Sequence, residues 1–374
     1  MKIAFYHELH KGGARRGTNE FAKQLKNRGN LVDLYTIDPI IKEEKEFYVN
    51  RYSYKFIPKK WMGRNPRVRL YKDTIELFKL FILNRKIAKD INRRKYDLVY
   101  VTASQFIESP FILNFINSPT FFYCNDPYYR IIYEPELFKD KNLNFFKIKY
   151  EQVNRIIRKN LDRWNISRAN YIISISKFTR DMFAKVYGKK GDIVYCGVDT
   201  THFVPKDLSK EYDLLFIGSY DFLDGYSFFQ EVVGEMKSNP KTRTILFENE
   251  WLSDKELLET YNKSRVFVSV SYREPLGLVP MEVMCCEIPV VAVDEAGHKE
   301  TIINNKTGYL LKRDAKLFAK KIDYLLNHNE ILMQMGRNAR RIMVEKWDWS
   351  VKGKELENYL FEKVKQHKNK TIRQ

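Results

Sequence analysis

Short apolar runs alternate with longer amphipathic stretches along most of the chain. The runs are rich in Val, Ile, Leu, Phe and Tyr, and we predict buried strands at residues 2–6, 31–36, 96–101, 120–124, 171–174, 213–218, 244–248, 266–270 and 290–293. Between them, apolar residues recur every three to four positions, and we predict helices at 18–28, 70–94, 145–163, 315–326, 330–345 and from about 350. This alternation is typical of βαβ units, so the predicted fold class is α/β with parallel sheets.

The alternation occurs in two blocks. It stops after Pro205 and restarts with a new strand, which places a domain boundary at 205/206. A length of 374 residues suits two domains that each bury a core. Residues 38–69 interrupt the first block and are rich in charges and aromatics, and the polar, basic residues 363–374 are expected to be a frayed tail.

Composition narrows the cellular setting. The longest apolar run, residues 77–83, is short and contains a lysine, so we expect no transmembrane helix. The chain becomes polar soon after Tyr6, which argues against a signal peptide. The four cysteines lie inside apolar segments without metal-ligand spacing. They are therefore expected to be buried thiols in a reducing cytoplasm.

The net charge of +19 is concentrated in the first half of the chain. Residues 1–200 contain 39 Lys/Arg and 21 Asp/Glu, whereas residues 201–374 contain 27 and 26. Such a field attracts nucleic acid or an anionic membrane. Residues 52–69 interleave cations with aromatics, and we consider Phe56, Lys59, Lys60, Trp61, Arg64 and Arg67 as a membrane or acceptor patch. A solvated basic loop is the alternative, and nucleic acid is the less favoured ligand because no nucleic-acid motif accompanies the charge.

The segment from Glu274 to Glu282 carries the clearest candidate chemistry. If Gly277-Leu278 opens a helix, its backbone N–H groups and positive dipole end face the same space as Glu274. Glu282 then lies just over one turn into the helix, where its carboxylate can accept hydroxyl groups. This set suits a nucleotide-sugar, although a solvated helix start with dipole-favoured acids has the same pattern.

Several segments together resemble glycosyltransferase family 4. They are residues 2–6, 11–16, 173–180, 187–188, 194–203, 274–282, 289–293, 296–300 and 305–311, in the order expected for that family. The resemblance implies a GT-B fold, with two Rossmann-like, doubly wound parallel-sheet domains facing a central cleft. It also implies an acceptor domain at 1–205, a donor domain at 206–348, and a final helix at 349–374 that crosses back to the first domain.

The resemblance also implies roles for particular residues. Glu282 would bind ribose and Glu274 the sugar hydroxyls, while the Gly12-Gly13 loop would approach the diphosphate. A plain tight turn is the alternative for that glycine pair. The full donor-binding set is Gly12, Gly13, Arg16, Gly218, Ser219, Glu274, Pro275, Leu276, Gly277, Leu278 and Glu282.

Two departures from the family pattern affect the expected catalysis. Asn125 stands where relatives commonly carry a histidine, and an amide cannot transfer a proton. Asp126 offers a carboxylate beside it, or simply caps a turn. Ser219 and the residues after it lack the arginine and lysine that neutralise the diphosphate in the family. We therefore assign Asn125, Asp126, Arg273 and Glu274 as catalytic candidates, with Arg273 as the replacement cation. Arg16, from the glycine loop, is another candidate for that cation, and Lys299 and Arg265 are weaker substitutes.

These observations predict a retaining, metal-independent hexosyltransferase. Its donor would be a UDP-, GDP- or ADP-sugar, with no cofactor, and its acceptor a lipid-linked or cell-surface glycan. It would be cytoplasmic and peripherally attached to the inner face of the membrane. Two alternatives stay open: a GT-B-shaped sugar- or nucleotide-binding protein without catalysis, and a basic membrane or nucleic-acid adaptor.

Overall fold

The computed structural model describes residues 1–10, 12–37, 46–58, 66–126, 130–134 and 145–372. Contacts divide the chain into two compact units, each with its own parallel sheet. Unit 1 comprises residues 1–175, 179–194 and 353–374, and unit 2 comprises residues 176–178 and 195–352. The sequence predicts a division at 205/206, where the alternation restarts, and the family resemblance implies a second one at 348/349.

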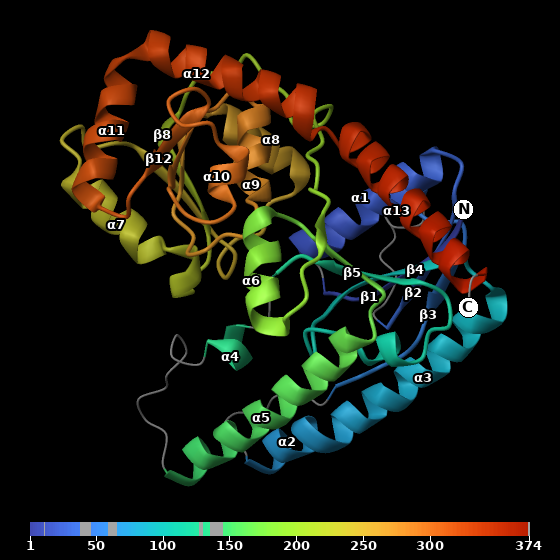
Figure 1. The fold of residues 1–374 in the computed structure, drawn as a ribbon. Helices are drawn as coiled ribbons and strands as arrows, with labels where there is room; N and C mark the ends of the chain where they lie inside the picture. Colours follow the sequence, from blue (N-terminus) through green and yellow to red (C-terminus); the bar gives the residue numbers. More distant parts are fainter. Residues whose placement is uncertain (11, 38–45, 59–65, 127–129, 135–144, 373–374) are drawn as a thin grey trace. The chain divides into compact units, whose positions relative to one another are not determined.

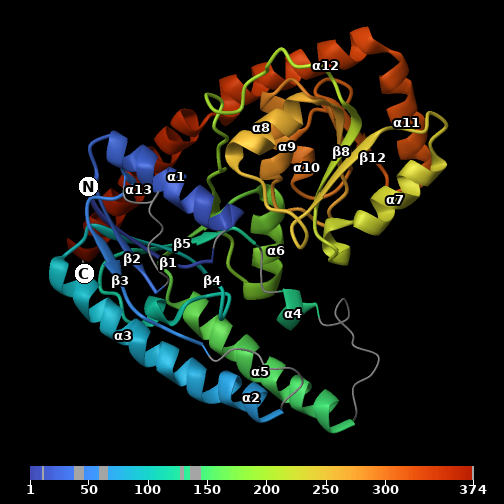
Figure 2. The ribbon, with the colours of Figure 1, turned by 180° about the vertical axis from the view of Figure 1, so that it is seen from behind.

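Unit 1 contains a sheet of seven parallel strands in the order β3-β2-β1-β4-β5-β6-β7. The strands are β1 (Lys2–Glu8), β2 (Leu31–Thr36), β3 (Arg51–Ser53), β4 (Leu98–Ser104), β5 (Thr120–Cys124), β6 (Tyr171–Ser174) and β7 (Asp192–Ile193). Its longer helices are α1 (Gly13–Asn27), α3 (Leu77–Arg94), α5 (Phe145–Ser167), α6 (Lys177–Tyr187) and α13 (Trp349–Ile372). In Figures 1 and 2, α1 and α13 lie on one side of this sheet and α3 and α5 on the other.

Short segments complete unit 1. They are α2 (Pro66–Tyr71), a π-helical segment (Lys72–Glu76), a 3₁₀ turn (Phe111–Asn114) and α4 (Arg130–Tyr133). The single helix predicted at 70–94 is therefore an α2–π–α3 succession that begins four residues earlier.

Unit 2 has a sheet of five parallel strands in the order β12-β11-β10-β8-β9. Its strands are β8 (Tyr212–Gly218), β9 (Thr242–Leu246), β10 (Ser264–Ser269), β11 (Val290–Val293) and β12 (Gly308–Leu311). Its helical segments are 3₁₀ Phe222–Asp224, α7 (Tyr226–Glu235), α8 (Asp254–Asn262), α9 (Leu278–Cys285), α10 (His298–Thr301), α11 (Ala315–Asn327), α12 (Asn329–Ile342) and a π turn (Met343–Trp347). Figures 1 and 2 show α7 and α11 on one side of β8 and β12, and α8, α9 and α10 on the other.

The two-block α/β prediction is confirmed, with two doubly wound parallel sheets. Each sheet is buried between helices, which explains why its strands read as continuous apolar runs. Strands β3 and β7, of three and two residues, escape the sequence pattern because they are too short to show a period, and the four-residue β12 is also missed. The four cysteines are buried thiols, as predicted.

The frayed tail predicted at 363–374 is wrong over its described part. Helix α13 continues to Ile372. Lys363 forms an ion pair of 2.9 Å with Asp192, and Lys368 one of 3.0 Å with Asp97. Val364 is buried between them in sequence. These contacts within unit 1 hold a segment whose composition alone suggests a loose end.

Candidate functional site

The carboxyl edge of the unit 2 sheet collects the loops with the strongest candidate chemistry. The chain leaves β8 toward β9 at one side and returns to β10 at the other, so the β8/β10 border is a topological switch point. Ligands of open α/β sheets bind in the crevice outside such a point. Backbone hydrogen bonds join the loops there: Tyr272 N–H to Leu223 O at 2.6 Å, and Gly297 N–H to Glu274 O at 2.8 Å.

The Glu274–Glu282 segment folds as its sequence predicts. Helix α9 begins at Leu278, and Gly277 caps it with a φ of 91°, a left-handed conformation that glycine adopts without strain. The Gly277 N–H donates to Glu274 Oε1 at 3.1 Å. Glu274 is therefore held at the positive end of α9, where the helix dipole favours an anion.

The neighbouring loop approaches this segment closely. Leu276 is buried, and a Cβ on Gly297 would lie 2.4 Å from the Pro275 carbonyl oxygen and 2.5 Å from the Leu276 Cα. Only glycine can occupy position 297 without moving that backbone. The β10 and β11 loops are thus packed into one rigid rim.

Glu282 lies on α9 and is only 3% exposed. Its Oε2 accepts a hydrogen bond of 2.9 Å from the Tyr261 hydroxyl on α8. A buried carboxylate needs such a donor to offset the loss of water. The sequence identifies Glu282, but not the tyrosine that positions it.

The loop after β8 carries an acid where a cation is expected. Gly218 ends the strand, and the Ser219 hydroxyl hydrogen-bonds to the Asp224 carboxylate. A Cβ on Gly218 would lie 3.0 Å from the Asp224 side chain, so the turn is tight. Any diphosphate in this crevice must find its positive charge on another loop.

Arg273, predicted as the replacement cation, lies at this edge. It has a φ of 52°, a left-handed conformation unusual for a non-glycine residue, and its guanidinium lies 5.1 Å from the Tyr272 ring centre. The weaker substitutes in unit 2 are in ion pairs: Lys299 with Asp294 at 3.3 Å, and Arg265 with Asp213 at 3.0 Å. Arg273 directly precedes Glu274 in the chain, and its role as the replacement cation stays a prediction.

Two polar residues near these strand ends, Arg313 and the buried His298, have no role in the sequence-based site prediction. Arg313, just after β12, forms two hydrogen bonds with Glu295 at 3.1 and 3.2 Å and donates to the Val270 carbonyl oxygen at 2.8 Å. His298 is buried, and its Nε2 lies 2.8 Å from the Ser269 hydroxyl. Burial, assisted by the nearby Arg313 charge, lowers the pKa of His298 to about 4. The imidazole is therefore neutral at physiological pH.

In unit 1 the switch point lies between β1 and β4. The Gly12-Gly13 pair follows β1 and opens α1, where the Arg16 N–H donates to Gly12 O at 3.0 Å. The loop is thus the start of a helix at a switch point, a position where backbone N–H groups can approach an anion such as a diphosphate. Arg16 lies in the first turn of this helix.

A hydrogen-bonded cluster lies at the end of β1, just before that loop in the chain. The buried Glu8 carboxylate, at the end of β1, accepts from the Tyr6 hydroxyl at 2.5 Å, from Asn84 Nδ2 at 2.9 Å, and from the Ser104 hydroxyl. Burial and the Glu8 charge raise the pKa of Tyr6 well above its usual value. The cluster fixes the ends of β1 and β4 against α3.

Asn125 and Asp126 follow β5 at the same sheet edge. Asn125 is 9% exposed, and its Nδ2 has no hydrogen-bond partner among the described residues, whereas Asp126 is exposed. Glu108, after β4, is also buried, and its Oε1 has no partner within the described ranges. Burial, then the charges of Asp126 and Asp162, raise the pKa of Glu108 well above its usual range. Sequence reasoning missed Glu108 because a lone acid in a loop carries no periodic signal.

The proposed membrane patch is only partly described. Phe56 is half-buried and packs edge-on against Phe106 with ring centres 5.1 Å apart, and Arg67 is exposed on α2. Lys59, Lys60, Trp61 and Arg64 lie outside the described residues. No helix among the described residues is long and apolar enough to cross a bilayer.

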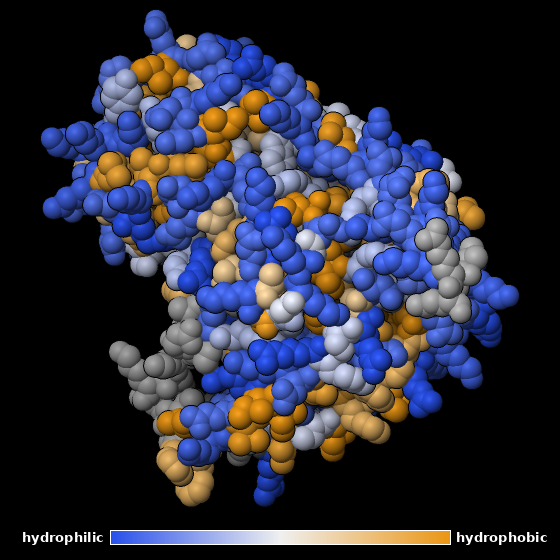
Figure 3. Space-filling model, in the orientation of Figure 1, coloured by the Kyte–Doolittle hydropathy of each residue, from blue (hydrophilic) through white to orange (hydrophobic). Residues whose placement is uncertain are grey.

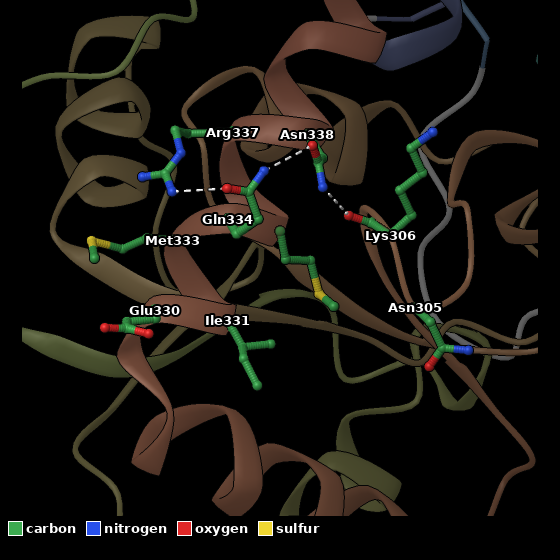
Figure 4. Close-up of a pocket in the computed structure, with 9 residues that line it drawn as sticks. Asn305, Lys306, Glu330, Ile331, Met333, Gln334, Arg337 and Asn338 are labelled. Atoms are coloured by element: carbon green, nitrogen blue, oxygen red, sulfur yellow. Dashed lines mark hydrogen bonds between the residues drawn. The ribbon is translucent and has the colours of Figure 1, made fainter.

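Unit 2 also contains a pocket away from the carboxyl edge of its sheet. This pocket of about 490 Å³ on α12 and the loop before β12 is lined by Gln334, Arg337, Asn338 and the Lys306 backbone, which form a hydrogen-bonded chain (Figure 4). It shares no residue with the predicted donor site. Within the described parts of the chain, no three His, Cys, Asp or Glu side chains are placed to share a metal ion.

Comparison with known proteins identifies the family. A family model described as "Glycosyltransferase Family 4" matches residues 11–202, and one described as "Glycosyl transferases group 1" matches residues 204–342. The capsular polysaccharide biosynthesis glycosyltransferase CapM of Staphylococcus aureus is 32% identical over 99 residues, which span 26% of each chain.

Solved structures are similar over nearly the whole chain. Sucrose-phosphate synthase from Thermosynechococcus elongatus has a TM-score of 0.71 at 15% identity, covering 98% of this chain and 99% of its own. Anabaena HepE in complex with UDP and glucose has a TM-score of 0.66 at 16% identity, covering 96% and 99%. The fold class is therefore GT-B, as the sequence resemblance implies. With the family model matching more than half of its length, the chain belongs to glycosyltransferase family 4.

Proposed function

We propose that this glycosyltransferase transfers a hexose, with retention of anomeric configuration, from a nucleotide diphosphate sugar to a lipid-linked or cell-surface glycan. The observation that carries the proposal is the carboxyl edge of the unit 2 sheet. There a helix N-terminus, Glu274 on its cap, Glu282 one turn later and Arg273 beside them are gathered at a switch point. These groups suit the diphosphate, sugar hydroxyls and ribose of one donor.

Each group has a role that follows from its chemistry. The backbone N–H groups at the start of α9 and the Arg273 guanidinium stabilise the negative charge that develops on the leaving diphosphate. Glu274, oriented by the Gly277 N–H, accepts hydrogen bonds from sugar hydroxyls. Glu282, oriented by Tyr261, accepts from the ribose. No protein-derived metal site is needed for this arrangement.

The proposed reaction takes place on one face of the sugar. The acceptor oxygen bonds to the anomeric carbon on the side from which the phosphate leaves, and the C–O bond to the diphosphate breaks. The departing phosphate oxygen takes the acceptor proton. Asn125 fits this scheme because it can hold a hydroxyl by hydrogen bonds without exchanging a proton.

The acceptor class is proposed from charge and from the relatives. CapM acts, by its name, in capsular polysaccharide biosynthesis, and HepE was solved with UDP and glucose. The excess of cations in residues 1–200 suits an acceptor held at an anionic surface. We therefore also propose peripheral attachment at the cytoplasmic face of a membrane.

One observation favours a second candidate. The Ser219–Asp224 hydrogen bond places a carboxylate beside the crevice where a diphosphate would need a cation. A GT-B-shaped protein that binds a sugar or nucleotide without catalysis would tolerate this arrangement.

Thermal unfolding with a panel of UDP-, GDP- and ADP-sugars, paired with detection of released nucleoside diphosphate, tests the proposal. A ligand that binds only the folded state raises the melting temperature. At a ligand concentration a hundredfold above its Kd, the free energy of unfolding increases by about 2.7 kcal/mol. The transferase predicts both stabilisation and release. Stabilisation without release in the presence of polysaccharide or lipid extracts supports the second candidate.

A further inference from the structure

Helix α5 of unit 1 exposes an unusual amount of apolar side chain. Phe146 is 81% exposed, Val153 57%, Ile157 51% and Trp164 38%. Their spacing of seven, four and seven residues places all four on one stripe of the helix. Phe145 and Ile156, also more than half exposed, flank this stripe. The Trp164 ring lies near that of Phe81 on α3, with ring centres 6.5 Å apart, whereas the other three residues of the stripe are more than half exposed. The stripe is therefore a candidate interaction surface.

The adjacent α2–α3 succession also exposes apolar side chains. Phe78 is 65% exposed and Ile82 47%, and on the same stripe α3 carries the exposed cations Arg85 and Lys89. The two helices are joined side by side: Arg69 and Glu151 form an ion pair of 3.1 Å, and Asp73 accepts from the Tyr150 hydroxyl at 3.0 Å. Figure 3 shows apolar side chains gathered among hydrophilic ones over the edge where Figure 1 draws α2, α3 and α5.

A groove lies on the α3 side of this surface. It has a volume of about 370 Å³ and is lined by Lys55, Phe56, Ile57, Tyr71, Glu76, Lys79, Ile82, Leu83 and Lys86. Three ammonium groups thus face one carboxylate across an apolar floor. Lys79 is oriented by a hydrogen bond of 2.7 Å to the Tyr71 hydroxyl. Ile57, at 73% exposure, stands at the rim.

The charge of the surface selects its partner. Residues 66–94 hold nine Lys/Arg and three Asp/Glu, and residues 145–167 hold six and two. Several of the acids are engaged internally, since Asp73 and Glu151 contact Arg69 and Asp162 is buried under Ser109 and two tyrosines. A second copy of so basic a surface would repel the first. An anionic lipid bilayer suits both the cations and the apolar side chains of this surface. Its phosphates would contact the cations, and the boundary of its acyl chains would accept Phe, Ile and Trp side chains.

We propose that the α2–α3/α5 face of unit 1 docks on an anionic membrane, with a lipid phosphate in the Lys55–Lys79–Lys86 groove. This inference rests on the proposed function in one respect, because a lipid-linked acceptor would then be presented to unit 1 at the membrane surface. It extends the patch considered at residues 52–69, of which Lys55 and Phe56 line the groove, onto α3 and α5. The apolar stripe supplies the salt-resistant part of binding, and the cations supply the part that salt screens.

Vesicle sedimentation of the full chain tests the docking. The probes are vesicles of phosphatidylcholine with phosphatidylglycerol, and vesicles of phosphatidylcholine alone. Three variants are compared. The apolar variant is Phe146→Ser with Ile157→Ser, and the cationic variant is Arg85→Ser, Lys86→Ser and Lys89→Ser. The matched control, called the α11 control, is Lys312→Ser just before α11 of unit 2 with Lys316→Ser and Lys320→Ser on that helix. All eight positions are exposed, so folding should be unaffected, and circular dichroism verifies this.

The expected results separate the two parts of the contact. Each cation at an anionic surface contributes about fivefold in affinity, so the cationic variant should bind anionic vesicles up to about 100-fold more weakly. The apolar variant should lose at least about tenfold and keep its salt dependence. The α11 control should bind like the wild type.

Three results would overturn the inference: equal sedimentation of the wild type with neutral and anionic vesicles, unchanged binding by both face variants, or an equal loss in the α11 control. Concentration-dependent dimers that the apolar variant abolishes, without vesicle binding, would assign the face to a second copy instead. Nucleotide-sugar titration on the same samples keeps the two proposals distinct. Donor binding without vesicle binding refutes only the docking, and the reverse refutes only the proposed donor.

Discussion

Replacement of Glu282 by glutamine probes the donor site with the least disturbance of the fold. In the structure Glu282 Oε2 accepts from the Tyr261 hydroxyl at 2.9 Å, and the side chain is 3% exposed. A glutamine oxygen can keep that hydrogen bond, while the other end of the amide becomes a donor that cannot accept a ribose hydroxyl. A hydrogen bond to a charged group contributes about 1.5 to 3 kcal/mol. Glu282→Gln should therefore weaken donor binding by about 10- to 150-fold.

Titration calorimetry with whichever nucleotide-sugar stabilises the wild type measures this loss. Tyr261→Phe is the matched control, because it removes the other half of the same contact. It leaves a buried carboxylate oxygen without its donor and should cost about 1 to 3 kcal/mol of unfolding free energy. Its effect on donor affinity should be smaller than that of Glu282→Gln. An unchanged Kd in Glu282→Gln would refute the assignment of ribose binding to this residue.

Three further predictions follow from single contacts. Arg273→Met should lower turnover by about 100-fold or more with little change in the melting temperature, because it removes a cation from the leaving diphosphate; if Ser219→Arg is needed before any turnover appears, the non-catalytic candidate is the better account. His298 has a pKa of about 4 in the folded protein and 6.5 in the unfolded chain, so between these pH values the unfolded chain binds one more proton than the folded protein. The free energy of unfolding should therefore fall by up to about 3 kcal/mol as pH drops through that window. Urea unfolding of His298→Asn should show a flatter pH dependence, and an identical slope would contradict the burial argument. Burial raises the pKa of Glu108 well above its unfolded value of 4.5, so the folded state loses stability relative to the unfolded state as pH rises above 4.5. The stability of Glu108→Gln relative to wild type should therefore be greater at pH 7 than at pH 4; lower stability of the variant at pH 7 would show that the ionised carboxylate has a partner.

Local signals in the sequence predict much of the fold and part of the site. The βαβ alternation can be predicted from the sequence because each strand is buried on both faces and each helix is buried on one. The start of α9 can be predicted from the sequence because its cap, Gly277, has a positive φ, and Glu274 lies three residues before that glycine. Both features depend on residues close together in the chain.

The features that were missed depend on distant partners. Glu8 is held by Asn84 and Ser104, 76 and 96 residues away, and Glu282 by Tyr261, 21 residues away. The end of α13 is fixed by Asp97 and Asp192, which no local pattern links to Lys363 or Lys368. Such pairs become visible only when the sheet brings them together.

The Ser219–Asp224 contact and the placement of Arg273 bear most on the chemistry. The sequence shows that the expected cations are absent after Gly218, but not that an acid faces Ser219. Arg273 directly precedes Glu274 in the chain, and its role as the replacement cation stays a prediction that the Arg273→Met variant tests.

Nucleoside diphosphate release by the wild type and by Glu274→Ala, with UDP-, GDP- and ADP-hexoses, tests the central claim most directly. Glu274 is half-exposed at the cap of α9, so its truncation should leave the fold intact while it removes the contact to the sugar hydroxyls. We predict release from one class of donor by the wild type and a loss of about 10-fold or more in Glu274→Ala. Neither binding nor release with any of the three donor classes, or equal release by Glu274→Ala, would contradict the account.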